Sequence, residues 1–223
     1  MINPDVFTPT TPNDCVFGNP QAKIKLQHLI NGVVPFPAFG KVGILLYGTW
    51  GTGKTTLSRL IPEAMEVVRG GKDPDYEFVA CGGKAVSVNT IVNVLNKMSL
   101  VSHNYSGLQY AVLDEVDNLT DLAQAHLKAT MDLPDAVFVI TTNYLAKVDK
   151  GIQNRCHLIE MNAAQPSDWL PLLTRVFNAC GVPVPPNNVL FPVIESCNGS
   201  AREIITSALS IACVAKSNQA VAV

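Results

Sequence analysis

The segment from Gly48 to Thr55 constrains the fold more than any other part of this sequence. Its residues, Gly-Thr-Trp-Gly-Thr-Gly-Lys-Thr, match the GxxxxGK[ST] pattern of a loop that binds phosphate through its backbone amides. An apolar run, Val42 to Tyr47, precedes the loop, and a helical pattern follows it to Val68. Strand, loop and helix in this order are the context that such a loop requires, so the segment predicts a triphosphate site.

The residue types in this loop fit phosphate chemistry. Its glycines let the backbone wrap around phosphate oxygens, Lys54 reaches the β- and γ-phosphates, and Thr55 offers its hydroxyl to Mg²⁺. Lys54 is thus a candidate catalytic residue, and Thr55 is a candidate metal ligand. Trp50 is unusual here: either it packs against a neighbouring subunit, or its ring is partly exposed without a role. The predicted nucleotide contacts in this segment are Gly48, Thr49, Trp50, Gly51, Thr52, Gly53, Lys54, Thr55 and Thr56.

Further apolar runs indicate a parallel sheet. They are Phe78–Cys81, Tyr110–Leu113, Val137–Thr142 and the short run Cys156–Met161. The intervals between them leave room for helices, and buried runs without polar alternation are typical of a sheet covered on both faces. We therefore predict an α/β fold of the P-loop NTPase class with a doubly wound parallel sheet.

Polar side chains follow two of these runs. Asp114 and Glu115 end one strand, and Asn143 ends the next. Because ligands of open α/β sheets bind at the carboxyl ends of the strands, we expect these side chains beside the phosphate loop. Asp114 is a candidate metal ligand that orders the Mg²⁺ shell. Glu115 is the candidate catalytic group that polarises the attacking water, and Asn143 can orient that water against the γ-phosphate.

The pattern of the chain changes near residue 164. Beyond it the apolar spacing is helical over Ser167–Cys180, 187–197 and 200–216. The start of the chain, rich in Pro, Thr and Asn, predicts an extended arm rather than an element with a buried face. The expected division is an N-terminal arm (1–15), a nucleotide-binding α/β domain (16–164) and a small all-helical lid domain (165–223).

Two arginines are candidates for phosphate contacts. Arg155 precedes the last apolar run and is either a solvated surface charge or a finger that reaches a neighbouring subunit's γ-phosphate. Arg202 begins the last predicted helix, where a cation opposes the helix dipole, so an anionic ligand such as ATP explains its position. The alternative for Arg202 is also a plain solvated charge.

Composition argues against several other classes of protein. The net charge is -2, so the overall balance does not indicate a nucleic-acid binder, and any DNA contact must come from a local patch. The six cysteines and four histidines lack the spacing of a zinc site, and we expect reduced thiols in the cytoplasm. No apolar run approaches the roughly 18 residues that span a bilayer, so no membrane contact is expected.

Taken in order, the motifs resemble the AAA+ superfamily, and more narrowly its clamp-loader branch, typified by the small subunits of replication factor C. The similar segments are Phe17-Gly-Asn19 (adenine side), Asp114-Glu-Val-Asp117 (DExx box), Thr142-Asn143-Tyr144 (sensor 1), Asn154-Arg155-Cys156 (Ser-Arg-Cys motif) and Gly199-Ser-Ala-Arg202 (sensor 2). The resemblance implies ATP and Mg²⁺ as cofactors, with Val16 and Phe17 near the base. It also implies that Arg155 acts in trans and Arg202 in cis.

The chain departs from that branch at a few positions. Asn154 replaces the Ser of Ser-Arg-Cys, Trp50 replaces a residue that is often proline, and Lys128-Ala129 replaces a basic pair. The sequence ends soon after the predicted lid and leaves no length for the collar domain of that branch, so either it is part of a longer chain or the protein assembles through its AAA+ faces alone. The resembled branch contacts DNA through segments on the inner surface of its ring. The corresponding residues here are the segment from Cys81 through Lys84 and Ser87 to Thr90, and the separate residue Lys128.

The resemblance implies a homo- or hetero-oligomer of AAA+ subunits, a pentamer or a hexamer, that couples ATP hydrolysis to DNA replication. DNA and a sliding clamp or a helicase are the expected partners. The alternatives are a helicase loader or protein-remodelling nucleotide switch, and a hexameric DNA translocase that drives branch migration. A viral source would place the protein in the host cytoplasm.

Overall fold

A parallel sheet forms the centre of the protein. The structure is a computed structural model that describes residues 7–82, 88–98, 102–133 and 135–221. The strand order is β2-β3-β4-β1-β5, and all the pairings are parallel. The strands are β1 (Gly43–Tyr47), β2 (Tyr76–Ala80), β3 (Gln109–Asp114), β4 (Ala136–Thr142) and β5 (Cys156–Glu160). The predicted doubly wound α/β fold is confirmed, and the last, short apolar run is indeed a strand.

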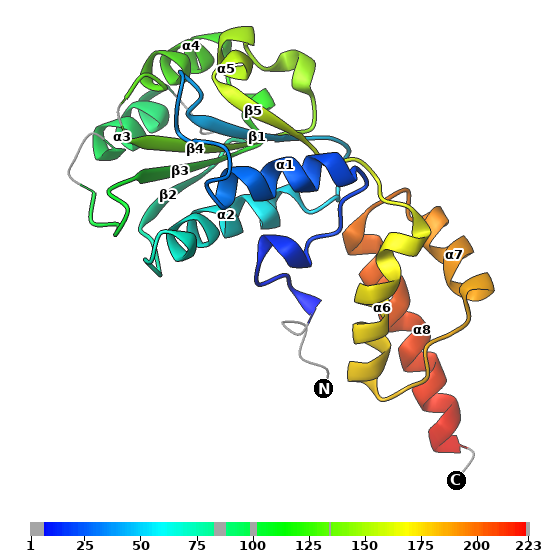
Figure 1. Ribbon diagram of the computed structural model, residues 1–223. Coiled ribbons are helices and arrows are strands. Elements are labelled where there is room, and N and C mark those ends of the chain that lie inside the picture. Colours follow the sequence, from blue (N-terminus) through cyan, green and yellow to red (C-terminus); the bar gives the residue numbers. More distant parts are fainter. Residues whose placement is uncertain (1–6, 83–87, 99–101, 134, 222–223) are drawn as a thin grey trace.

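Helices cover both faces of this sheet (Figure 1). On one face lie α1 (Pro20–Ile30) and α2 (Lys54–Val68), and on the other lie α3 (Val88–Met98), α4 (Asp121–Thr130) and α5 (Lys150–Asn154). Consecutive strand residues alternate between these faces even though the strands are apolar throughout. Ile44 and Leu46 pack toward α1 and α2, whereas Leu45 packs toward the other layer.

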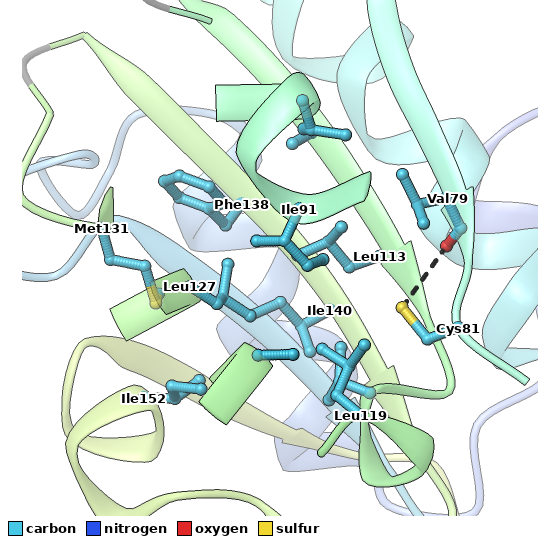
Figure 2. Packing of buried hydrophobic residues seen from close by; sticks show 14 of the residues in the cluster. Val79, Cys81, Ile91, Leu113, Leu119, Leu127, Met131, Phe138, Ile140 and Ile152 are labelled. Atoms are coloured by element: carbon cyan, nitrogen blue, oxygen red, sulfur yellow. Dashed lines mark hydrogen bonds between the residues drawn. The ribbon is translucent and has the colours of Figure 1, made fainter. Parts of the chain in front are cut away.

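Figure 2 shows the second of these layers at close range. Phe138 and Ile140 of β4 project from the sheet, and Leu127 of α4 and Ile152 of α5 pack over them. All four side chains are fully buried. This layer fixes α4 and α5 against β4, and it therefore sets the position of the loops that leave the carboxyl end of that strand.

Side chains cap the helices that frame the site. Asn19 accepts hydrogen bonds from the first amides of α1, Thr120 accepts one from Ala123 in α4, and Asp149 accepts from Gly151 and Ile152 in α5. Such caps satisfy amides that have no partner within the helix, and each stabilises its helix by about 1 kcal/mol. Helix α2 has no side-chain cap, because the phosphate loop leads directly into it at Gly53.

The last part of the described chain is helical. It consists of α6 (Pro166–Cys180), α7 (Asn187–Ser196) and α8 (Ala201–Val221), which lie to one side of the sheet in Figure 1. These helices pack around their own buried cluster, which includes Trp169, Phe177, Leu190 and Ile204. The predicted helices are present, and α8 runs five residues beyond its expected end at Lys216. The expected domain boundaries stay a prediction.

The start of the chain corrects one expectation. The segment before Val16 is not simply an extended arm, because it contains a short 3-10 turn, Pro12–Asp14, and a buried face. Phe7 is 5% exposed and belongs to the cluster of the last three helices, and Cys15 is also buried. Sequence composition missed this face because Phe7 packs on residues more than 160 positions away along the chain. Within the described residues, no helix is both long and apolar enough to cross a bilayer.

Candidate nucleotide-binding site

A cavity of about 440 Å³ lies where the phosphate loop, the N-terminal segment and the last helices meet. That volume is within the usual range for sites of small molecules and cofactors. Glu115, Thr141 and Asn143 border it at the carboxyl ends of β3 and β4. The other lining residues are Phe7, Thr8, Pro9, Asp14, Cys15, Val16, Trp50, Gly51, Thr52, Gly53, Lys54, Thr55, Thr56, Trp169, Leu172, Ala201, Arg202, Ile205 and Leu209.

The loop around Lys54 has the conformation of a phosphate cradle. Gly51 and Gly53 have φ values of 76° and 89°, which residues with a side chain rarely adopt. Lys54 is only 7% exposed, and its Nζ donates hydrogen bonds to the carbonyls of Gly48 (3.1 Å) and Thr49 (2.6 Å). Burial lowers the pKa of Lys54, while the nearby Asp114 carboxylate opposes that shift. An ammonium group that interacts mainly with loop carbonyls is ready to exchange them for phosphate oxygens.

The predicted metal ligands are in direct contact. The Thr55 hydroxyl donates to both carboxylate oxygens of Asp114, at 2.8 and 3.0 Å. The Thr141 hydroxyl donates to Asp114 Oδ1 at 2.6 Å. A carboxylate and a hydroxyl at the mouth of a phosphate loop are the oxygen donors that Mg²⁺ prefers, so the residues present fit this ion. Bound there, Mg²⁺ supplies charge neutralisation of the phosphates.

Glu115 is held in an unusual backbone conformation. Its φ of 59° and ψ of 51° are left-handed, a state that costs a non-glycine residue about 1–3 kcal/mol and persists only where the surroundings enforce it. Here the Glu115 amide donates to the Thr141 hydroxyl at 2.9 Å, so β4 fixes the backbone after β3. The Glu115 carboxylate lies against Gly82 after β2, so a side chain at residue 82 would require the carboxylate to move.

Asp117 links the Glu115 segment to Asn143. Its Oδ1 accepts a hydrogen bond from the Thr142 hydroxyl (2.6 Å) and one from the Asn143 amide (3.2 Å). Asn143 is thereby held at the cavity with its side chain among the lining groups. We assigned no role to Asp117 or to Thr141 from the sequence. The sequence carries no direct signal for them, because their contacts depend on the parallel register of Leu113 with Ile140, which brings the ends of these strands together.

The last helix contacts the phosphate loop directly. The Ala201 amide, at the start of α8, donates to the Gly51 carbonyl at 2.9 Å. A Cβ atom on Gly51 would lie 2.5 Å from the Ser200 hydroxyl, so only glycine permits this approach. Arg202 follows immediately, is exposed and lines the cavity. Within the described residues its guanidinium has no ion pair, so it is available to an anion in the cavity.

Arg155 lies at the amino-terminal end of β5, whereas the cavity lies at the carboxyl ends of the strands. It directly precedes β5, and its carbonyl accepts the amides of Val42 and Gly43 at the start of β1. Its guanidinium pairs with Asp132, with Nε to Oδ1 at 3.0 Å and Nη2 to Oδ2 at 3.2 Å. These hydrogen bonds raise the pKa of Arg155 and lower that of Asp132. Arg155 does not line the cavity of its own chain.

The structure separates the remaining candidates. Val16 lines the cavity, whereas the Phe17 ring is buried in the layer under α1, and Gly48 and Thr49 also lie outside the lining. The Trp50 ring is 61% exposed and packs edge to face on Tyr144, with ring centres 5.4 Å apart. Both interpretations of Trp50 therefore stay open, although its ring is not without a contact.

The candidate DNA contacts are only partly described. Lys84 and Ser87 lie outside the described residues, as does the side chain of Thr90, which is in α3. Lys128 forms an ion pair with Asp149 at 3.1 Å, and both side chains are about one-third exposed. Asp149 therefore competes with phosphate for Lys128.

Together the parallel sheet, the phosphate loop and the acids at the strand ends define a P-loop nucleotide-binding protein. Residues 44–162 match the family described as "ATPase family associated with various cellular activities (AAA)". The chain belongs to this family. That membership supports nucleotide binding and ATPase activity in general.

Similar proteins carry different activities. Replication factor C subunit 4 of Oryza sativa subsp. japonica is 27% identical over 209 residues, which cover 90% of this chain and 58% of that protein. Lon protease of Mycolicibacterium smegmatis is 27% identical over 176 residues, covering 64% and 22%. The structure of the RuvB Holliday junction branch migration motor of Thermotoga maritima matches with a TM-score of 0.69 at 17% identity, covering 91% and 64%. The chain thus spans less than two thirds of the length of each of these proteins.

Proposed function

We propose that this chain is a Mg²⁺-dependent ATPase subunit of a clamp-loader-like oligomer, in which active sites are shared between neighbouring subunits and ATP turnover is coupled to DNA replication. The observation that carries this proposal is the separation of Arg155 from the cavity. Arg155 lies at the amino-terminal end of β5 and outside its own cavity, and in this proposal its guanidinium exchanges Asp132 for the γ-phosphate of a neighbouring copy's nucleotide.

The residues at the cavity have complementary tasks in this proposal. The loop amides and Lys54 bind the β- and γ-phosphates, and Thr55 and Asp114 hold Mg²⁺. Glu115 accepts a proton from the attacking water, and the Asn143 side chain orients that water. Arg202 of the same chain and Arg155 of the neighbour contribute positive charge at the γ-phosphate, where negative charge accumulates as the bond breaks.

The replication role depends on similarity to the replication factor C subunit. That match covers most of this chain, and it includes the motifs around Asp114 and Arg155. We propose DNA and a ring-shaped sliding clamp or a helicase as partners on this basis. From the same similarity we propose a pentamer or a hexamer. An arginine that acts on the next subunit's nucleotide makes a head-to-tail interface, and such an interface forms a ring when the rotation between subunits closes.

A protein-remodelling nucleotide switch is the second candidate. It is favoured by the match to Lon protease, which covers 64% of this chain at the same identity. In that case the partner is a protein, and DNA does not stimulate turnover. The branch-migration motor is the third candidate, and its only support is the shared fold at 17% identity.

The test is steady-state ATP hydrolysis over a range of protein concentrations, with and without primed DNA and Mg²⁺. Mass determination with a slowly hydrolysed ATP analogue runs in parallel. We expect turnover per subunit to rise with protein concentration and with DNA, and to require Mg²⁺. Turnover that is independent of concentration in a monomer would overturn the shared site, and turnover that ignores DNA would favour the remodelling switch.

A further inference from the structure

The cavity has two chemically different ends. Thr52, Lys54 and Thr55 form a polar end at the phosphate loop, while Phe7, Leu172, Ile205 and Leu209 form an apolar end between the N-terminal segment and the last helices. Helix α8 spans both ends, because Arg202, Ile205 and Leu209 recur at helical spacing along one face. Leu209 lies seven residues after Arg202, which corresponds to about 10 Å along the helix axis. A nucleotide placed with its phosphates on the loop therefore directs its base toward the apolar end.

Trp169 is part of the apolar end and carries a polar group that the protein does not satisfy. It is 3% exposed, it lines the cavity, and it lies in the first turn of α6. Its indole Nε1 is buried and has no hydrogen-bond acceptor anywhere in the described residues. Buried N–H groups without an acceptor are rare in native proteins, because each loses its interaction with water and gains nothing in return.

Packing alone does not account for an indole at this position. The neighbours of Trp169 in its cluster are apolar, among them Leu172, Leu173 and Phe7. A phenylalanine or leucine would fill such surroundings without burying a donor, whereas tryptophan is usually found where its N–H has a partner. Trp169 lines the cavity but its Nε1 is closed to solvent, so a ligand there can supply the missing acceptor only if the indole turns toward the cavity when the ligand binds.

We propose that the Trp169 Nε1–H donates a hydrogen bond to a ring nitrogen of the nucleotide's base, and that this contact makes Trp169 a determinant of base selectivity. The proposal rests on the proposed function, since it requires a nucleotide in this cavity. Purine bases present in-plane ring nitrogens as acceptors, and their flat rings fit the apolar wall. Discrimination arises because a base without an acceptor at that point would leave the buried donor unpaired.

The experiment measures binding by calorimetry, without turnover. Wild-type protein and Trp169→Phe are titrated with ATP, with 1-deaza-, 3-deaza- and 7-deaza-ATP, and with inorganic tripolyphosphate as a probe without a base. We expect Trp169→Phe to bind ATP about tenfold more weakly, the size of one net hydrogen bond, and to bind tripolyphosphate as the wild type does. One deaza analogue should bind the wild type about tenfold more weakly than ATP does, yet bind Trp169→Phe as well as ATP does.

Trp50→Phe is the matched control. It removes the other indole of the cavity, whose ring is 61% exposed and whose N–H can reach solvent. Whatever Trp50→Phe does to affinity, the ratio between ATP and each deaza analogue should stay at the wild-type value. A tryptophan that only supports the fold would lower tripolyphosphate binding together with ATP binding, and would leave the analogue ratios unchanged.

The outcomes separate this proposal from the function that it rests on. Equal ATP affinity of wild type and Trp169→Phe overturns the role of Trp169, and so do analogue ratios that are the same in both proteins. In either case ATP binding by the wild type leaves the proposed function standing. A wild type that binds neither ATP nor tripolyphosphate would overturn both.

Discussion

At the carboxyl ends of its strands the sheet carries acids, whereas cations predominate around the amino-terminal end of β5, where Arg155 is paired with the Asp132 carboxylate. Asp114 is the last residue of β3, and Glu115 and Asp117 follow it beside the phosphate loop. Arg155 directly precedes β5, and a shallow depression of about 550 Å³ beside it is bordered by Lys25, Lys41, Lys150, Gln153, Asn154, Cys156, His157 and Leu158. Desolvation and the nearby Lys25 and Lys41 lower the pKa of His157, which fits a cationic surface.

This difference in charge between the two ends of the strands indicates an active site that is shared between neighbouring subunits. The acidic end of the sheet can bind a metal and activate water, but among the described residues that line the cavity only Lys54 and Arg202 offset the charge of a triphosphate. The basic end has cations but no phosphate loop. Opposite charges at opposite ends allow copies of the chain to associate head to tail, with each basic end meeting the acidic end of the next copy.

The largest effect is expected from Arg155→Ala, which tests whether the active site is shared between subunits. Turnover should fall on the order of 10³-fold, as for other arginine fingers, while ATP affinity stays near the wild-type value because Arg155 does not line its own cavity. Steady-state hydrolysis and calorimetry measure the two quantities.

A mixing experiment sharpens the same prediction. Arg155→Ala subunits lack the finger but keep Glu115, so mixing them with Glu115→Gln subunits should create some sites with both groups intact. Turnover of the mixture should exceed that of either variant alone. If mixing did not raise turnover, or if Arg155→Ala were fully active, Arg155 and Glu115 of neighbouring subunits would not act in one site.

Glu115→Gln tests the acidic end of the sheet itself. The loss of the group that accepts the proton should reduce turnover about 10²- to 10³-fold, while Thr55 and Asp114 keep the metal site intact. ATP should therefore remain bound, which filter binding with labelled ATP can follow over time. If this variant hydrolysed ATP rapidly, another residue would be the base, and Asp117 would be the next candidate.

The sequence predicted those parts of the fold and of the candidate site that depend on local pattern. The phosphate loop, the strand before it and the helix after it are encoded within a few residues, and all the expected strands are present. The placement of Glu115 and Asn143 at one cavity followed from the general behaviour of parallel sheets.

The sequence did not reveal contacts between distant segments. Thr141 binds Asp114 and Glu115 across 27 and 26 residues, and Phe7 packs against helices at the other end of the chain. Trp169 looked like an ordinary apolar position of a helix, since only the packed structure shows that its N–H is buried without a partner. Such features arise from tertiary packing, and residue spacing does not encode them.

Thr141→Val tests the link between β3 and β4. It removes the hydroxyl that donates to Asp114 and accepts the Glu115 amide, so the left-handed backbone of Glu115 loses its support. We expect the free energy of unfolding to fall by about 1–3 kcal/mol in denaturant titrations, and turnover to fall about tenfold. Thr56→Val, in the loop helix, is a control for a threonine hydroxyl outside this link, and its effect on unfolding should be smaller. Equal effects of both substitutions would contradict the assigned role of Thr141.

The smallest expected effect is the pH dependence of stability, which differs for Lys54 at the cavity and Arg155 beside β5. Burial holds the pKa of Lys54 below its ordinary value of 10.5, whereas pairing with Asp132 raises the pKa of Arg155. Between the lowered pKa and 10.5 the unfolded chain binds more protons at Lys54 than the folded chain does. The contribution of Lys54 to stability should therefore rise as pH rises through that window. Compared with Lys54→Met, the wild type should gain stability with increasing alkalinity.

The same linkage predicts the opposite trend for ligand binding. A triphosphate favours the charged form of Lys54, so binding in the alkaline window requires proton uptake, and affinity for ATP should decline as pH rises. Arg155→Ala should leave this decline unchanged, because the guanidinium that it removes stays protonated throughout this window and takes up no proton when ATP binds. Calorimetric titrations at several alkaline pH values measure the slope. If the ATP affinity of Lys54→Met declined with pH at the same slope, another group would be the one that titrates, and Lys54 would not contact the phosphates.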